Sequence, residues 1–271
     1  MPGTDDDVGR AVLVGVDGST TSAKAVERAV REAALRGAAL HIVFVAPRTD
    51  VREQGACVLD AAADRAARVD RHVRVRTTLR SGAPVAVLLE AARTAEVVVV
   101  GTRRLGTRRP RPDEAVACGS VSTRVAAAAA VPVVVVPPVE DRRRRTSDVV
   151  VGVDGSAAAD AALAFALDEA RVTGGRVVAV CAGAPASEGA ATVRAALDRV
   201  GAVGHGGVDV HPLVVGQRPP TALRELGADA ALTVVGTRGR RGPSGAVLGP
   251  VSQEVLRNAP GPVAVVHAGP R

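Results

Sequence analysis

Short, continuous runs of Val and Ile alternate along the whole chain with longer Ala-rich stretches. Apolar runs without polar alternation are typical of parallel strands buried on both faces, and the Ala-rich stretches are typical of crossover helices. In the first half the pattern predicts strands over residues 11–16, 41–45, 73–79, 97–100 and 133–136. It predicts helices over residues 19–35, 60–71, 84–95 and 120–130. We therefore expect a five-stranded, doubly wound sheet with right-handed crossovers.

The second half repeats this pattern. VLVGVDGS at Val12–Ser19 recurs as VVVGVDGS at Val149–Ser156, an offset of 137 residues. VVVVGTR, which ends at Arg103, recurs around Gly236 at an offset of 135, and VPVVVV, which begins at Val131, recurs at an offset of 130. Because three motifs keep their order, the sequence predicts a duplicated domain. The offset falls by five residues between the second and third motifs. This fall indicates that the first copy carries an insertion inside its glycine-rich loop.

The chain of 271 residues is long enough for two compact domains. We expect a flexible N-terminus over residues 1–10, a first domain over 11–138 and a second over 148–268. Residues 139–147 form an arginine-rich linker, and the EDRRRRTSD stretch over residues 140–148 is too charged to bury. Its arginines are expected to stay hydrated, the alternative being a tether that touches RNA or an acidic partner.

A glycine-rich loop, GTRGRRGPSGAVLGPVS, occupies residues 236–252 of the second copy, between an apolar strand and a helix. Such a turn can cradle phosphate, because glycine permits close backbone approach and the helix N-terminus favours negative charge. The hydroxyl of Ser252 would add a donor. The spacing fits neither GxxxxGK[ST], nor GxGxxG, nor a GxSxG nucleophile elbow.

The spacing Gly236-x2-Gly239-x9-Gly249, together with Asp154 after the first strand of its copy, resembles the ATP-binding loop of the universal stress protein family. Both halves are similar to that family in its tandem, actinobacterial form, over nearly the whole chain except the first ten residues and the linker. The resemblance implies two α/β domains of the Rossmann-like, adenine-nucleotide alpha-hydrolase-like type. They would form an intrachain pseudo-dimer through their last strands, 133–136 and 263–266.

The resemblance also implies the residues of each site. Asp154 would lie by the adenine and ribose, and Ala182 would line the adenine pocket. In the second copy the phosphates would be wrapped by Gly236, Gly239, Gly249, Val251 and Ser252. In the first copy the matching positions are Asp17, Val45, Gly101, Gly119, Ser120, Val121 and Ser122. The implied ligand is ATP, and any metal would arrive with it as Mg²⁺.

Both copies depart from the family pattern. Pro250 stands where the family has Ser or Thr, which removes a hydroxyl and an N–H donor. In the first copy Arg104 takes the place of the second glycine, and residues 108–112 are inserted. Its arginines, Arg103, Arg104, Arg108 and Arg109, either reach phosphate or point into water. We expect the second copy to bind ATP and the first to bind weakly or not at all.

Composition narrows the other classes of function that the chain could have. Aromatic residues are 1% of the chain, which disfavours stacking on single-stranded nucleic acid despite a net charge of +7. Lys24 is the single lysine, so the positive charge is almost all guanidinium, which suits phosphate or carboxylate partners or an ordinary solvated surface. The five histidines lack ligand spacing, so no metal site is expected. Isolated cysteines and the lack of a long apolar stretch predict a soluble, cytoplasmic protein.

The leading hypothesis is an ATP-binding stress or signalling module whose glycine loop is ordered by nucleotide and read by an unidentified protein. The alternative is an ATP-independent scaffold with degenerate sites. Asp17 and Asp154 lack a repeated histidine or carboxylate neighbour, so the sequence predicts at most slow ATP hydrolysis and no catalytic residue. Homodimers of the whole chain and no membrane association are also expected.

Overall fold

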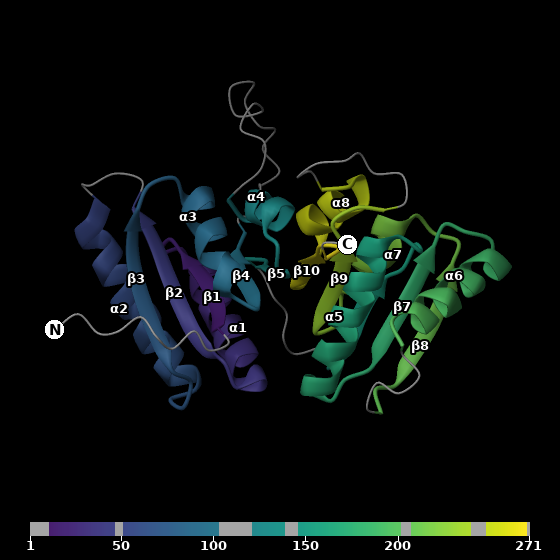
Figure 1. Cartoon of the computed structure of the whole chain (residues 1–271), viewed down its shortest axis with the longest axis horizontal. Helices are drawn as coiled ribbons and strands as arrows, with labels where there is room; N and C mark the ends of the chain where they lie inside the picture. The colour runs from purple at the N-terminus through teal and green to yellow at the C-terminus, as the bar shows by residue number, and fades with distance from the viewer. Residues whose placement is uncertain are drawn as a thin grey trace, which may run out of the picture. The chain divides into compact units, whose positions relative to one another are not determined.

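The structure, a computed structural model, describes residues 11–46, 51–102, 121–138, 146–201, 207–239 and 248–269 (Figure 1). The chain divides into two compact units, Met1–Gly101 and Thr102–Arg271. The division falls inside the first repeat, so the last helix and strand of that repeat belong to the second unit. The domain bounds at 138 and 148 stay a prediction.

The first unit is a parallel sheet in the order β3-β2-β1-β4. Its strands are β1 (Ala11–Val16), β2 (Ala39–Ala46), β3 (Val75–Ser81) and β4 (Val97–Gly101). Its helices are α1 (Thr20–Arg36), α2 (Arg52–Val69) and α3 (Pro84–Ala91), which is followed by the 3-10 turn η2 (Ala92–Thr94). Helices α1 and α2 contact each other, and each also packs against the sheet. Fully buried valines and leucines fill the core between these helices and the sheet.

The second unit is a sheet in the order β5-β10-β9-β6-β7-β8. Its strands are β5 (Val133–Val136), β6 (Val149–Gly152), β7 (Val177–Ala182), β8 (Val210–Val215), β9 (Leu232–Gly236) and β10 (Val263–Val266). Its helices are α4 (Val121–Ala128), α5 (Ala157–Thr173), α6 (Ala186–Arg199), α7 (Pro219–Leu226) and α8 (Pro250–Asn258). All of its strand pairs are parallel except β5 with β10.

The antiparallel pair joins the last strand of each repeat. Val133 lies opposite Val265, and Val135 lies opposite Val263. The predicted meeting of the two last strands is therefore present inside the second unit. All four of these residues are buried, so this pairing is part of the apolar core.

The predicted fold class is confirmed, and β1 and β5 begin and end where the sequence placed them. The predicted start of the second helix was wrong, because α2 begins at Arg52 rather than residue 60. Gly55 explains the difference: an added Cβ would lie 2.6 Å from Leu79 and 2.7 Å from Phe44. The glycine lets the first turn of α2 lie close to the sheet. Gly189 does the same in α6, 2.5 Å from Val214.

Candidate functional site

A tight turn follows the first strand of each repeat and presents an aspartate at the carboxyl edge of the sheet. In the second unit, Oδ1 of Asp154 accepts a hydrogen bond from the N–H of Ser156 at 3.0 Å. Gly155 has φ 78°, a conformation that side chains disfavour. In the first unit, Asp17 accepts from the N–H of Ser19 in the same way, also at 3.0 Å. The two repeats thus build one turn twice.

The serine of this turn caps the following helix. Oγ of Ser156 accepts a hydrogen bond from the N–H of Ala159 at 3.2 Å, as an N-cap residue does. The same hydroxyl donates to the carbonyl oxygen of Arg238 at 3.3 Å. The aspartate turn is thereby tied to the loop that follows β9. In the first unit Ser19 caps α1 by accepting from the N–H of Ser22 at 3.1 Å.

Two of the predicted glycines allow the β9 loop to approach this turn. A Cβ on Gly236 would lie 2.7 Å from the carbonyl carbon of Ala158, in the first turn of α5. A Cβ on Gly239 would lie 2.5 Å from Oδ2 of Asp154. Gly236 therefore needs glycine for close backbone packing, while Gly239 lets the loop approach the Asp154 carboxylate. Gly249 is under less constraint, since its nearest neighbour would be the Cα of Arg238 at 3.4 Å.

Helix α8 begins beside the same loop. Gly249 is its N-cap, and the Gly249 N–H donates to the carbonyl oxygen of Thr237 at 2.7 Å. Pro250 occupies the first helical position, where the missing N–H would have had no intrahelical partner. No side chain of the described residues caps this helix. The N–H groups of Val251 and Ser252, in the first turn, likewise have no acceptor within the helix.

The hydroxyl of Ser252 is used within the fold. The side chain is 4% exposed, and its Oγ donates to the carbonyl oxygen of Gly236 at 2.6 Å. What Ser252 can offer a ligand is therefore its backbone N–H rather than its hydroxyl proton. The sequence motif alone did not reveal the direction of this hydrogen bond.

The remaining predicted residues lie at the same kind of strand and helix ends. Ala182 is the last residue of β7, and Val45 is near the end of β2, where it is paired with Arg80. Gly101 packs against the backbone of Thr21, as Gly236 does against α5. Val121 and Ser122 open α4, exposed and buried respectively. Gly119, Ser120, Arg104 and the insertion at 108–112 lie outside the described residues, as do residues 240–247 of the second loop.

Sequence reasoning overlooked Thr237 and Arg238 as parts of this site. Thr237 is buried and accepts the hydrogen bond from Gly249, while Arg238 accepts from Ser156. The charge of Arg238 also bears on His267, whose Nε2 lies 3.1 Å from the carbonyl oxygen of Ala126. Burial lowers the pKa of His267, the bond to Ala126 opposes this, and Arg238 lowers it further. The repeat of the GTR motif at residues 101–103 and 236–238 was the sequence signal that could have identified these two residues.

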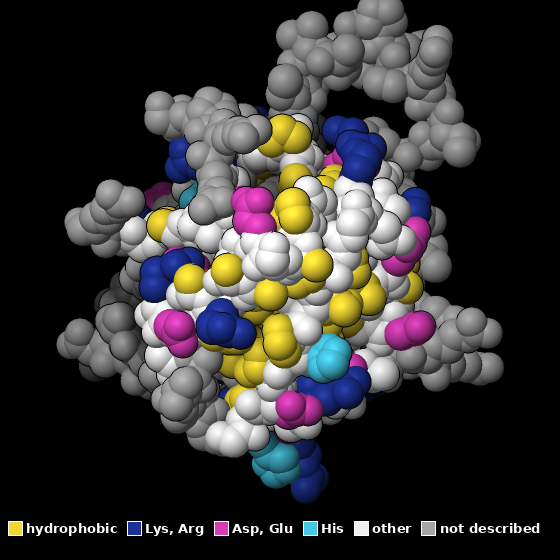
Figure 2. Space-filling model, turned by 90° about the vertical axis from the view of Figure 1, so that its right-hand side faces the viewer, with side chains coloured by type: hydrophobic (Ala, Val, Ile, Leu, Met, Phe, Trp, Pro, Cys, Tyr) yellow, Lys and Arg dark blue, Asp and Glu magenta, His cyan; other side chains and the backbone are white. Residues whose placement is uncertain are grey.

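The described residues bring together no group of three or more side chains able to hold a metal ion. None of the described helices is long and apolar enough to cross a membrane. The face drawn in Figure 2 carries positive, negative and apolar side chains intermixed, without a continuous field of one charge. That mixture is typical of an ordinary solvated surface on this side.

The universal stress protein family model matches residues 9–137 and 146–267. The chain belongs to the universal stress protein family. A universal stress protein of Mycolicibacterium smegmatis is 34% identical over 288 residues, covering 94% of this chain and 96% of that protein. One of Mycobacterium tuberculosis is 31% identical over 293 residues, with the same coverage of both chains. The tandem, actinobacterial form of the universal stress protein family is thus confirmed.

The fold of a solved universal stress protein supports the same assignment. A universal stress protein from Archaeoglobus fulgidus matches with a TM-score of 0.73 and 21% identity, covering 97% of each chain. At that identity the match shows the shared fold, with both repeats included.

Proposed function

We propose that the second repeat binds ATP between the Asp154 turn and the start of α8, and that the chain acts as a nucleotide-responsive stress or signalling module in the cytoplasm. The observation that supports this most directly is the approach of Gly239 to Asp154, where a Cβ would lie 2.5 Å from Oδ2. Together with the hydrogen bond from Gly249 to Thr237, this approach supports a site in which a carboxylate, loop glycines and a helix N-terminus share one sheet edge, a combination suited to a nucleoside and its phosphates.

Different residues would contact different parts of the ligand. The half-buried carboxylate of Asp154 would accept hydrogen bonds from the ribose or adenine, and Ala182 would bound the adenine. The N–H groups of Val251 and Ser252 would meet phosphate oxygens, helped by the positive end of the α8 dipole. Any Mg²⁺ would be held through the phosphates, because such ions keep several waters and few protein ligands.

The first repeat is the weaker candidate for a physical reason. The position that matches Gly239 holds Arg104. At Gly239 a single added carbon would already lie 2.5 Å from Oδ2 of Asp154, so a long side chain at the matching place is a less favourable neighbour for the aspartate turn. We therefore expect the phosphate contacts of the first repeat to differ from those of the second.

Two matched variants of the full chain, Asp154→Ala and Asp17→Ala, test this ranking. Each deletes the same turn hydrogen bond, so their effects on the fold should be alike. In calorimetric titration with ATP, Asp154→Ala should weaken binding about tenfold or more, as the loss of a charge-assisted hydrogen bond does. Asp17→Ala should leave binding unchanged. A larger loss in Asp17→Ala would reverse the assignment, and melting curves without ligand would confirm that both variants fold.

An ATP-independent scaffold is the second candidate, and two observations favour it. Pro250 removes one donor from the start of α8, and the Ser252 hydroxyl is committed to Gly236. A thermal-shift series with ATP separates the two functions, because ligand at one hundred times its Kd stabilises a protein by about 2.7 kcal/mol. No shift at millimolar ATP would support the scaffold.

A further inference from the structure

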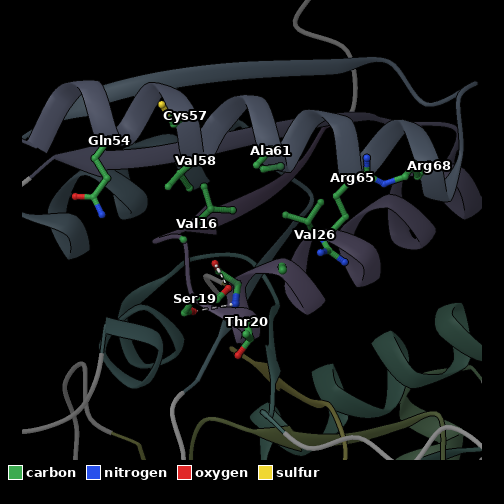
Figure 3. A pocket seen from close by; sticks show the side chains of 14 residues that line it. Val16, Ser19, Thr20, Val26, Gln54, Cys57, Val58, Ala61, Arg65 and Arg68 are labelled. Carbon is green, nitrogen blue, oxygen red and sulfur yellow. Dashed lines mark hydrogen bonds between the residues drawn. The ribbon is translucent and has the colours of Figure 1, made fainter.

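A groove of about 410 Å³ lies between α1 and α2 in the first unit (Figure 3). Its α1 side begins at the turn after β1, and its α2 side extends from Gln54 to Arg68. The volume falls within the range of small-molecule sites. Its apolar lining comes from Val16, Ala23, Val26, Val58, Ala61 and Ala62.

The groove borders the candidate nucleotide site of the first repeat and runs away from it between α1 and α2. It reaches Gly18 and Ser19 at the edge of the sheet but is lined by none of Asp17, Val45 and Gly101. Two valines, Val16 and Val26, are buried at its base. It offers no aromatic side chain on which a base could stack. The side chains along the base of the groove are aliphatic, and those at its ends are polar.

The second repeat has larger residues where the first leaves this space. At the offset of 137 residues, Ala23 and Val26 correspond to Asp160 and Leu163. Gly55 and Gly189 align α2 with α6, and this alignment matches Arg65 to Arg199. Arg199 spans the two helices and donates to Asp160 at 2.7 and 2.9 Å. An ion pair and a leucine therefore occupy the region that stays open in the first repeat.

The corresponding arginine of the first repeat is directed elsewhere. Arg65 donates to Glu27 of α1 at 2.8 Å, one turn beyond Ala23. The bridge consequently leaves the space beside Ala23 unfilled. Arg65 keeps 41% of its side chain exposed and still lines the groove.

The charge of the groove is concentrated at one end. Figure 3 shows Arg65 and Arg68 together at one end of the row of α2 side chains, with Gln54 and Cys57 at the other. Arg68 is exposed, and the corresponding residue in the second repeat is Ala202. The extra positive charge thus belongs to the first repeat alone. Glu27 offsets the charge of Arg65, which leaves Arg68 as the stronger site for an anion.

We propose that this groove binds a small aliphatic carboxylate. The hydrocarbon chain lies along the valines and alanines between α1 and α2, and the carboxylate meets the guanidinium of Arg68, a geometry that guanidinium groups favour. Removal of the chain from water drives binding, and Arg68 selects the anionic end. The proposal does not depend on ATP binding by the second repeat.

Calorimetric titration of the full chain with octanoate and with octanol tests the charge selection. Octanoate should bind more tightly than octanol. Arg68→Gln should weaken octanoate binding about tenfold, the effect of one charge-assisted hydrogen bond, and leave octanol binding unchanged. Equal affinity for the two probes, or octanoate binding unaffected by Arg68→Gln, would overturn the proposal.

A second experiment closes the groove with residues that the fold already accepts. The double variant Ala23→Asp with Val26→Leu installs the residues of the second repeat opposite Arg65 and should abolish octanoate binding. Ala61→Leu fills the same space from α2 if the double variant does not fold. Leu35→Ala, an exposed position of α1 outside the groove, is the control and should bind normally. Undiminished binding in the folded groove-closing variants would contradict the proposal.

Cys57 reports directly on where the probe lies. Its exposed thiol lines the groove, whereas the Cys181 thiol is buried. Bound octanoate should slow alkylation of Cys57, measured on its peptide by mass spectrometry. An unchanged rate at saturating octanoate would place the probe elsewhere. The groove could instead be an interface with a second copy of the chain. In that case sedimentation of the parent protein would show a dimer that the groove-closing variants lose. That result would also refute the proposal.

Discussion

The hydroxyl of Ser252 donates to the carbonyl oxygen of Gly236 at 2.6 Å and so fastens the first turn of α8 to the end of β9. Ser252→Ala should lower the free energy of unfolding by about 1 kcal/mol, the usual net worth of one buried hydrogen bond. Urea unfolding monitored by circular dichroism measures this. Ser187→Ala, at an exposed position of α6, is the control and should change stability little. Equal effects would mean that the hydrogen bond contributes nothing.

Two glycines of the loop should respond differently to alanine. At Gly236 the new methyl group would meet backbone atoms of Ala158 at 2.7 Å, and backbone cannot rotate away. We expect Gly236→Ala to cost about 1–3 kcal/mol, as overpacking does. At Gly249 the nearest atom would be 3.4 Å away and φ is −66°, so Gly249→Ala should cost less, about 0.5–1 kcal/mol, from the loss of a glycine N-cap. Thermal unfolding of both variants checks the order, and a reversed order would refute the packing argument.

Glu32 makes the first unit sensitive to acid. Burial alone would raise the pKa of Glu32, but the charges and hydrogen bonds of Arg28 and Arg36 more than offset this and lower it. As pH falls, the unfolded chain takes up the proton first. The stabilisation is therefore full above the ordinary pKa of 4.5 and is lost as pH falls through the lower folded value.

Glu32→Gln should accordingly be less stable at pH 7 by about 3 kcal/mol, because two half-buried guanidinium groups lose their counter-charge. Its unfolding free energy should also vary less between pH 5 and pH 3 than that of the parent protein, within roughly the window set by the linkage argument. Glu188→Gln, exposed on α6, is the matched control. A parallel pH dependence in parent and variant would contradict this role for Glu32.

His41 should remain neutral in mildly acidic solution. Burial, followed by the charges of Arg76 and Arg80, lowers the pKa of His41 to about 4. Its Nε2 lies 2.9 Å from Oγ1 of Thr78, and its Nδ1 lies 3.1 Å from Nη2 of Arg76. Since the unfolded chain protonates near 6.5, the contribution of His41 is full above that pH and is lost between 6.5 and about 4.

An NMR titration of the His41 ring checks this, and Arg76→Gln should raise the measured pKa by removing a nearby positive charge. Arg71→Gln, which is exposed and outside β2 and β3, should leave the pKa in place. A titration near 6.5 in the parent protein would show that the ring is solvated.

The antiparallel pair of β5 and β10 predicts how fragments behave. A fragment of residues 146–271 lacks β5, so the buried edge of β10 would be exposed and should self-associate. A fragment that begins at residue 121 keeps α4 and β5, so the edge of β10 stays covered and the fragment should self-associate less. Size-exclusion chromatography with light scattering distinguishes them. If the shorter fragment stays monomeric and equally stable, the pairing has little energetic weight.

Much of the fold could be predicted because the strands are continuous valine runs that have few other ways to be buried. The start of α2 could not, since Gly55 reads as a helix breaker until Phe44 and Leu79 are seen against it. The site showed the same limit: the spaced glycines and Asp154 were visible in the sequence, but the inward hydrogen bond of Ser252 was not.

The groove of the first unit was hidden for a related reason. The exchange of Ala23 for Asp160 can be read by aligning the repeats, yet it has no meaning until α1 and α2 are known to be neighbours. The open space depends on where Arg65 points, and a sequence carries no record of side-chain direction.

Strand β8 ends the order of the second sheet, and Pro212 lies in its middle, opposite Ala179. The N–H of Val177 donates to Asp209 and that of Gly183 donates to Val215, so alternate residues of β8 face β7 and Pro212 faces outward. An extended peptide that paired with this edge of β8 would meet the proline ring at a position where the sheet requires an N–H donor. Cross-β growth from this edge is thus interrupted at the centre of the strand.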